Sequence, residues 1–387
     1  MSVSDSSRVQ LAYVAESEYG VQETGSNLQI LRHTGETLKQ DTGIQQSAEI
    51  RSDRQVADIA RTGIGVSGQV NAEMTYGTYD DLLAAALMSA GWSSEVEETE
   101  ITYSMSDVDN SINDSASGFV TAGYQASQWV KISGFTESAN NGYFKIVSVA
   151  AGKMVLSGGT VVTEAAGDSV TVTMGPQIVN GTTKTSFNIE REYQDLSNEL
   201  SLFLGCMINE LGLNVALDSM ITGNFGIIGK KEQSLTASGG SGYDAASTTE
   251  VMNCVDDILA LFENQVAVDS TTFSLSLNNN LRARNKLGEL GAFDVGTGIV
   301  NVTGSLQAYF QSKTLFDKYL NFTATSLAIK LEDGAGNAYI IDLPNVNFTD
   351  GQRQAGGQNQ DIIADLQWQA FLDATEGITI RIAKFAA

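Results

Sequence analysis

Residues 64–87, IGVSGQVNAEMTYGTYDDLLAAAL, decide the fold. Apolar and polar side chains alternate from Ile64 to Thr75, which predicts a strand with one dry face and one wet face. Gly77 ends the alternation, and Asp80 and Asp81 then precede an apolar run, which predicts the start of a short helix. The stretch therefore predicts a strand that leads into a buried helix.

The same pattern occurs again near the other end of the chain. Residues 66–72, VSGQVNA, correspond to residues 302–308, VTGSLQA, at an offset of 236. Two later similarities keep the same order, at offsets of 140 and 141: residues 185–189 with 325–329, and residues 221–225 with 362–366. A common order at near-constant offsets predicts a duplicated β-rich domain whose first copy contains an insertion of about 96 residues.

The composition is typical of a globular protein that is rich in strands. The chain has 387 residues, with 38 glycines, only 2 prolines and 42% hydrophobic residues, which is enough for two or three domains. It contains no apolar run long enough for a membrane span and no signal peptide at its start. Cys206 and Cys254 are too few for a disulfide framework, so we expect synthesis in a reducing cytoplasm and no membrane partner.

Residues 116–175 predict a compact unit of their own. Short strand-like runs separated by turn residues are typical of a small all-β barrel or sandwich, and this segment falls inside the surplus of the first copy. We therefore predict the following domains: the first copy at 1–110 and 179–235, the inserted domain at 111–178, a Ser/Gly-rich linker at 236–250 and the second copy at 251–387.

The charge balance is strongly acidic. The chain has 46 acidic and 22 basic residues, for a net charge of −24. Such a protein gains nothing from the counterion release that drives binding to phosphate backbones. The charge indicates either ordinary acidic solubility or a surface that faces DNA without holding it.

Nothing in the sequence supports catalysis. Residues 63–68, GIGVSG, match a dinucleotide-binding spelling, but a strand rather than a helix is predicted after them. His33 is the only histidine. Residues 107–114 place oxygen ligands in alternation, yet they lack the glycine and glutamate of a calcium loop. We therefore predict no enzyme, no catalytic residue, no cofactor and no metal ion.

Two basic patches precede the central strands. Arg51 and Arg54 lie ahead of the first of these strands, and Arg282 and Arg284 lie ahead of the second. In an acidic protein such patches predict contacts between subunits, with solvated loops as the alternative.

The chain resembles the tail tube proteins of long, flexible-tailed bacteriophages. The segments that carry the resemblance are residues 48–55, 66–70, 76–83, 186–193 and 226–231, and residues 130–146 resemble extra β modules in that family. The resemblance covers most of the chain. It implies a mainly β fold of two tail-tube-type β-sandwich domains with short flanking helices, plus the small inserted all-β domain.

The resemblance also implies a function. Rings of subunits would stack into the virion tail tube through which DNA passes into the host, after assembly in the host cytoplasm. A duplicated chain favours a three-fold ring with pseudo-six-fold symmetry over a six-fold ring. A tape measure protein and a tail terminator are the other partners that the family implies. The alternative is a non-tubular acidic β-module binding protein, either a capsid decoration protein or an adhesin.

In such a ring the wet faces of the central strands would line the bore, without cations that could hold DNA. The dry faces, which include Val70 and Leu306, would pack on the helices. The alternative for these polar residues is simple exposure on an ordinary sandwich. The residues that we expect to line the lumen are Gln69, Asn71, Glu73, Asn224, Gln307, Asp365, Gln367 and Gln369.

Overall fold

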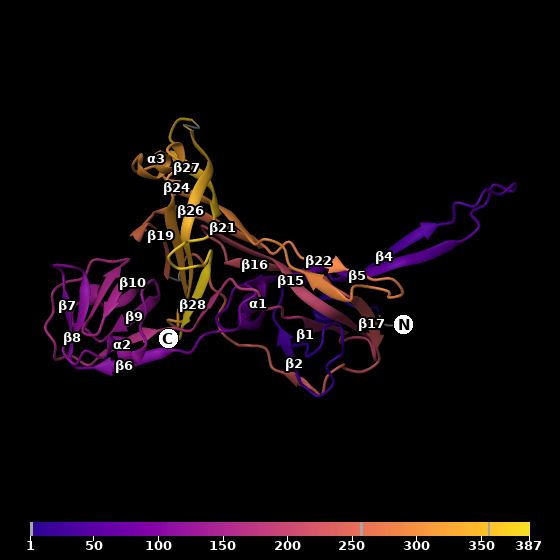
Figure 1. Ribbon diagram of the computed structural model, residues 1–387, viewed down its shortest axis with the longest axis horizontal. Coiled ribbons are helices and arrows are strands. Elements are labelled where there is room, and N and C mark those ends of the chain that lie inside the picture. The colour runs from indigo at the N-terminus through magenta and orange to yellow at the C-terminus, as the bar shows by residue number, and fades with distance from the viewer. Residues whose placement is uncertain (1–2, 256–257, 355–356) are drawn as a thin grey trace.

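The computed structural model describes residues 3–255, 258–354 and 357–387, and strands dominate it (Figure 1). The predicted mainly β fold is confirmed. The helices and 3-10 turns are all short: η1 Ser6–Arg8, α1 Asp80–Ala86, α2 Phe119–Ala122, η2 Ser138–Asn140 and α3 Thr314–Leu320. Within the described residues, no helix has the length and apolar character that crossing a membrane requires.

A first set of strands forms what we call the first unit. Its sheet has the order β4-β5-β16-β15-β14-β1, and α1 lies against β15. The strands of the first unit are β1 Val9–Ala15, β2 Leu28–Leu31, β3 Gly35–Glu36, β4 Lys39–Gln46, β5 Ile59–Glu73, β14 Phe187–Tyr193, β15 Leu200–Ala216, β16 Thr222–Gly229, β17 Lys231–Leu235 and β18 Tyr243–Asp244. The short strand β13 Gln177–Val179 precedes β14 in the chain but pairs with β28 Arg381–Phe385 near the other end.

A second set of strands, the second unit, follows the same plan. Its sheet has the order β21-β24-β27-β26-β25-β19, and α3 lies against β26. The strands are β19 Ile258–Glu263, β20 Val266–Ala267, β21 Ser270–Asn278, β22 Arg282–Arg284, β23 Asp294–Gly296, β24 Asn301–Tyr309, β25 Thr325–Glu332, β26 Ala338–Gln354, β27 Ile363–Ala370 and β28 Arg381–Phe385.

The two units also share their strand register. Val70 of β5 pairs with Phe225 of β16, and at the predicted offsets of 236 and 141 Leu306 of β24 pairs with Leu366 of β27. β15 and β26 carry a bulge at corresponding places, between Ile208 and Glu210 and between residues 348 and 350. The two strand-helix stretches therefore occupy equivalent positions.

One sequence correspondence is wrong by two residues. β15 has a second irregularity, between Phe203 and Cys206, and Phe187 pairs with Cys206 at its end. Thr325 pairs with Val346 at the matching irregularity of β26. Phe187 therefore corresponds to Thr325 and not to Leu327. Apolar and polar residues alternate along the start of β14, so a slip of two residues keeps every side chain on its face, and because its first five residues are all buried no wet face fixes the register.

A separate seven-stranded sheet forms the inserted domain, in the order β6-β12-β9-β10-β11-β8-β7. It begins at Val96, upstream of the expected boundary at residue 111. Its first strand is an acidic edge strand, which hid the strand pattern. The strands are β6 Val96–Glu100, β7 Tyr103–Ser106, β8 Ser111–Asp114, β9 Trp129–Ser133, β10 Gly142–Ala150, β11 Lys153–Ser157 and β12 Val170–Met174.

The predicted linker is held against the first unit. Tyr243 pairs in parallel with Leu28 of β2, and its hydroxyl donates a hydrogen bond of 2.5 Å to Glu190. Arg32 donates to the carbonyl oxygen of Thr249 over 2.6 Å. The Ser/Gly-rich composition indicated flexibility, but side chains from distant strands fix this segment.

Candidate lumen face and open sheet edges

One strand joins the two units into a continuous sheet. The first half of β15 pairs with β14, and its second half, from Glu210 to Ala216, pairs with residues Thr272–Asn278 of β21. We call this β15·β21 pairing the internal joint. It produces one antiparallel sheet of eight strands in the order β4-β5-β16-β15-β21-β24-β27-β26.

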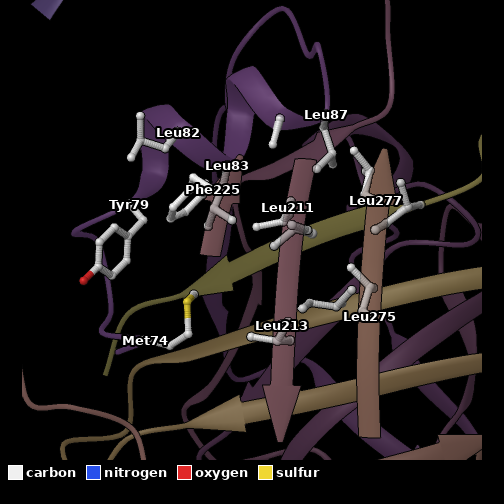
Figure 2. Packing of buried hydrophobic residues seen from close by; sticks show 14 of the residues in the cluster. Met74, Tyr79, Leu82, Leu83, Leu87, Leu211, Leu213, Phe225, Leu275 and Leu277 are labelled. Carbon is white, nitrogen blue, oxygen red and sulfur yellow. The ribbon is translucent and has the colours of Figure 1, made fainter. Parts of the chain in front are cut away.

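Helix α1 covers the apolar side of the internal joint. Figure 2 shows Leu83 and Leu87 of the helix above Leu211 of β15 and Leu277 of β21, and all four side chains are buried. The dry faces of both units belong to the same buried cluster. Burial of this apolar surface from both units stabilises the joint.

All eight predicted lumen residues lie on the opposite, polar face of this sheet. Asn71 of β5 pairs with Asn224 of β16, and Gln307 of β24 pairs with Asp365 of β27. The first unit contributes Gln69, Asn71, Glu73 and Asn224, and the second contributes Gln307, Asp365, Gln367 and Gln369, all exposed or half-buried. Because the internal joint makes the sheet continuous, both groups face one side.

Sequence reasoning missed the polar side chains of three strands on this face. Glu210 and Asn214 lie on β15, and Ser274 on β21 shares a hydrogen bond of 2.7 Å with Ser305. On β26, Gln352 donates to Asp365 over 3.2 Å. The alternation of residues 210–216 could have revealed β15, but the apolar run before it hid the signal.

The charge of this face is negative. Glu73, Glu210, Asp350 and Asp365 contribute carboxylates, and the ammonium group of Lys39 lies 2.9 Å from Asp41.

Arg353, by contrast, stacks on the apolar side, with its guanidinium carbon 3.8 Å from the centre of the Phe316 ring. The described side chains that β16, β15, β21, β24, β27 and β26 present on the polar face include no Lys or Arg, and Lys39 of β4, opposite Ser67, is paired with Asp41.

Both edges of the eight-stranded sheet are open. β4 pairs with β5 alone, and residues 347–354 of β26 pair with β27 alone, within the part of the chain that the structure describes. By register, residues 35–46 pair with β5 as β21 pairs with β24 in the second unit. Residues 350–354 pair with β27 as the second half of β15, which forms the internal joint, pairs with β16 in the first unit. The two open edges therefore hold, by register, the places that the two halves of the internal joint hold in the opposite units. Long unpaired edges favour association with another chain.

The four arginines expected at subunit contacts lie in two different places. Arg51 and Arg54 lie in the loop between β4 and β5, two strands that project from the body (Figure 1), and Arg51 pairs with Asp53 over 2.7 Å. Arg282 and Arg284 lie on β22, where Arg284 pairs with Asp294 over 2.7 Å. The structure does not bring the two pairs together, and their contact with other subunits stays a prediction.

Features that could support chemistry are already engaged in the fold. The GIGVSG segment, residues 63–68, lies within β5, as its alternation predicted. A cavity of about 460 Å³ is lined by Tyr13, Asp80 and Asp81, among other residues. Asp80 accepts hydrogen bonds from Tyr339 and Lys384, and burial together with the Asp81 carboxylate raises the pKa of Tyr13. No cluster suited to a metal ion occurs among the described side chains.

Comparison with protein families gives a match over most of the chain. A family model described as phage tail tube protein matches residues 6–370. No curated protein matches the chain.

Proposed function

The chain belongs to the phage tail tube protein family, and from this membership we propose that three copies close into a ring and that stacked rings form a conduit for DNA. It is a structural component of the phage tail. The finer proposals concern the ring symmetry, the lining of the bore and the passage of DNA.

The observation that carries the proposal is the match between the internal joint and the two open edges. Neighbouring strands of the eight-stranded sheet are antiparallel, so an even number of strands leaves β26 antiparallel to β4 of a following copy. Transferring the register of the internal joint places Lys39 opposite Gln352 of the neighbour and Asp41 opposite Asp350. Closing the sheet in this way leaves no free edge.

The two equivalent units favour three chains in the ring. Each chain supplies two pseudo-equivalent positions, so three chains supply six, and a closed ring satisfies every open edge. The polar face of the sheet would then line the bore, with α1 and α3 outside it. DNA would pass along carboxylates and amides, which repel or weakly contact phosphate rather than hold it.

Electron microscopy of the purified chain tests the proposal. We expect rings or tubes with three-fold symmetry and six similar positions around the bore. Native mass spectrometry of single rings should give three chains. A stable monomer at high concentration, or a ring of six chains, would contradict the proposed assembly.

The lining predicts the effect of added positive charge. We expect the Asn71→Lys, Glu73→Lys double variant to form tubes, because both side chains lie on the solvent side of β5, but to slow DNA ejection several-fold. Assembled particles can be compared by the rate of DNA release in vitro. The matched control is Asp107→Lys with Val108→Lys on the exposed surface of the inserted domain, which should release DNA at the normal rate. Equal rates for both double variants would remove the lumen assignment.

A further inference from the structure

Residues 279–300, which link β21 to β24 and which we call the second arm, pack against the first unit. Val295 of this arm is 1% exposed and packs against Met88 and Met207 of the first unit. The side-chain amide of Asn279 donates to the carbonyl oxygen of Ala86 over 2.8 Å. The second arm thus covers the end of helix α1 and seals the region beside the internal joint.

Among the residues that the structure describes, the equivalent connection in the first unit makes no such contact. Residues 42–64, the first arm, comprise the outer parts of β4 and β5 and the loop between them. By register they correspond to the second arm between β21 and β24, and the two arms are nearly equal in length. Ile44 and Ile59 stand in the places of Leu281 and Val295, yet they are 65% and 56% exposed. The first arm projects away from the body, on the side opposite α3 (Figure 1). It therefore cannot cover a surface of its own second unit.

The surface equivalent to the one under the second arm is bare. Met88 and Phe322 occupy the same place after α1 and α3, because each donates its N–H to a carbonyl three residues earlier, at 3.1 Å, and each has a φ of 51°. Met88 is 5% exposed under the second arm, whereas Phe322 is 65% exposed. Leu320, in the place of Ala86, is 62% exposed. Isolated exposed apolar residues are common on protein surfaces. Here, however, the exposed residues of the first arm and of this surface both correspond to residues that are in contact with one another at the second arm, which indicates an unfilled interface.

A difference between the two units at one equivalent position also indicates that the partner of the exposed surface is more apolar than the second arm. Lys230 lies 3.3 Å from Glu289 of the second arm, which gives that contact an ion pair. At the equivalent place the second unit has Phe371, 39% exposed, followed by Leu372, 61% exposed. The first arm correspondingly carries Ile50, which is 98% exposed.

We propose that the first arm of each chain docks on the second unit of the neighbouring chain in the same ring, with Ile44 and Ile59 packed against Leu320 and Phe322. The occupant of this surface is therefore a second copy of this chain. The inference rests on the proposed ring, because the neighbour that pairs its β26 with β4 is the one that brings its α3 to the first arm. The second arm on the first unit is the precedent within the chain.

Cross-linking in assembled tubes tests the docking. A chain with Ile59→Cys and Phe322→Cys is assembled and treated with a short bismaleimide, and the products are separated by size under denaturing conditions. Docking within a ring predicts covalent species that stop at three chains, because the contacts close on themselves. Docking on the next ring would instead give species longer than three chains and would overturn the proposal. Each single-cysteine chain, which retains Cys206 and Cys254, controls for other links.

A second pair of cysteines separates failure of the docking from failure of the ring. Lys39→Cys with Gln352→Cys reports the pairing of β4 with β26 of the neighbour. If this pair links and the 59–322 pair does not, the ring stands and the docking is wrong. If neither pair links and microscopy shows no rings, the proposed function itself fails.

A substitution at Phe322 measures what the contact contributes. Phe322→Asn removes the aromatic side chain. Asparagine tolerates the left-handed backbone at this position, so the monomer should fold normally. We expect the concentration needed for assembly to rise at least tenfold. Val108→Asn removes an apolar side chain that is even more exposed, at 90% against 65% for Phe322, from the inserted domain and should leave that concentration unchanged. Unchanged assembly of Phe322→Asn would overturn the docking.

Discussion

At the scale of residues, two equivalent glycines show how closely neighbouring strands approach. A Cβ atom on Gly68 would lie 2.5 Å from the carbonyl oxygen of Thr37, and one on Gly304 would lie 2.0 Å from that of Ser274. These contacts are at matching places in the two units. The sequence contains both glycines in its repeated pattern, but only the structure shows that strand approach is the reason for them.

We expect Gly304→Ala to destabilise the protein by about 3 kcal/mol, because the new methyl group would overlap backbone and the Trp368 ring. Gly65→Ala is the matched control in a strand, since its Cβ would meet its nearest neighbour at 3.8 Å. Urea denaturation followed by fluorescence measures both changes. Equal stability of the two variants would show that the sheet adapts more easily than its geometry indicates.

At the scale of elements, alternation predicted the strands that have one wet face and failed for those that do not. β5, β16, β24 and β27 carry a clear alternation, and the predicted polar face follows from it. The first half of β15 is buried on both sides, so its continuous apolar run does not show which face of the strand points to the core. The candidate site was therefore predicted where strands are half-buried and missed where tertiary packing covers both faces.

The contact between the inserted domain and the second unit depends on buried charges that no local pattern predicts. Lys145 of β10 lies 2.8 Å from Asp342 of β26 and 3.2 Å from Glu376. Arg381 also contacts both carboxylates, at 3.2 and 2.9 Å. Residues from three distant segments thus form one network, and the Asp342 side chain has no exposed surface.

We expect Lys145→Ala to weaken the docking of the inserted domain by about 3 kcal/mol, because Asp342 and Glu376 would share one remaining cation. Hydrogen exchange across β9 and β26 measures the loss of protection. Lys153→Ala removes a solvent-exposed pair with Asp109 and should change stability by less than about 1 kcal/mol. Similar exchange in both variants would mean that apolar contacts around Trp129 hold the domain without the network.

At the scale of the whole molecule, the sequence predicted two similar halves but not how they meet. The internal joint depends on the length of β15 and on the position of β21, and neither has a local signal. The arms show the same limit. The two have similar lengths, yet the second is folded down and the first is extended, because only the second finds its partner surface in its own chain.

The overall charge predicts how assembly responds to salt. Each chain has a net charge of −24, so bringing chains together costs repulsion that salt screens. We expect the concentration needed for assembly to fall several-fold between about 20 and about 300 mM NaCl. Light scattering at a series of concentrations measures this. Disassembly at the higher salt would show that ion pairs between chains outweigh the repulsion.

The internal joint changes how many associations between chains the assembly of a ring would require. Each association between free chains costs roughly 4–15 kcal/mol of translational and rotational freedom, and the proposed ring of three fused chains needs fewer such associations than a ring of six separate chains would. The fused interface is also guaranteed by chain connectivity, whereas the one between chains must be recognised from solution. Natural selection can therefore change the interface within the chain and the interface between chains separately. Gly351 and Arg353, which lie in the places of Leu211 and Leu213, show that the two strands have diverged.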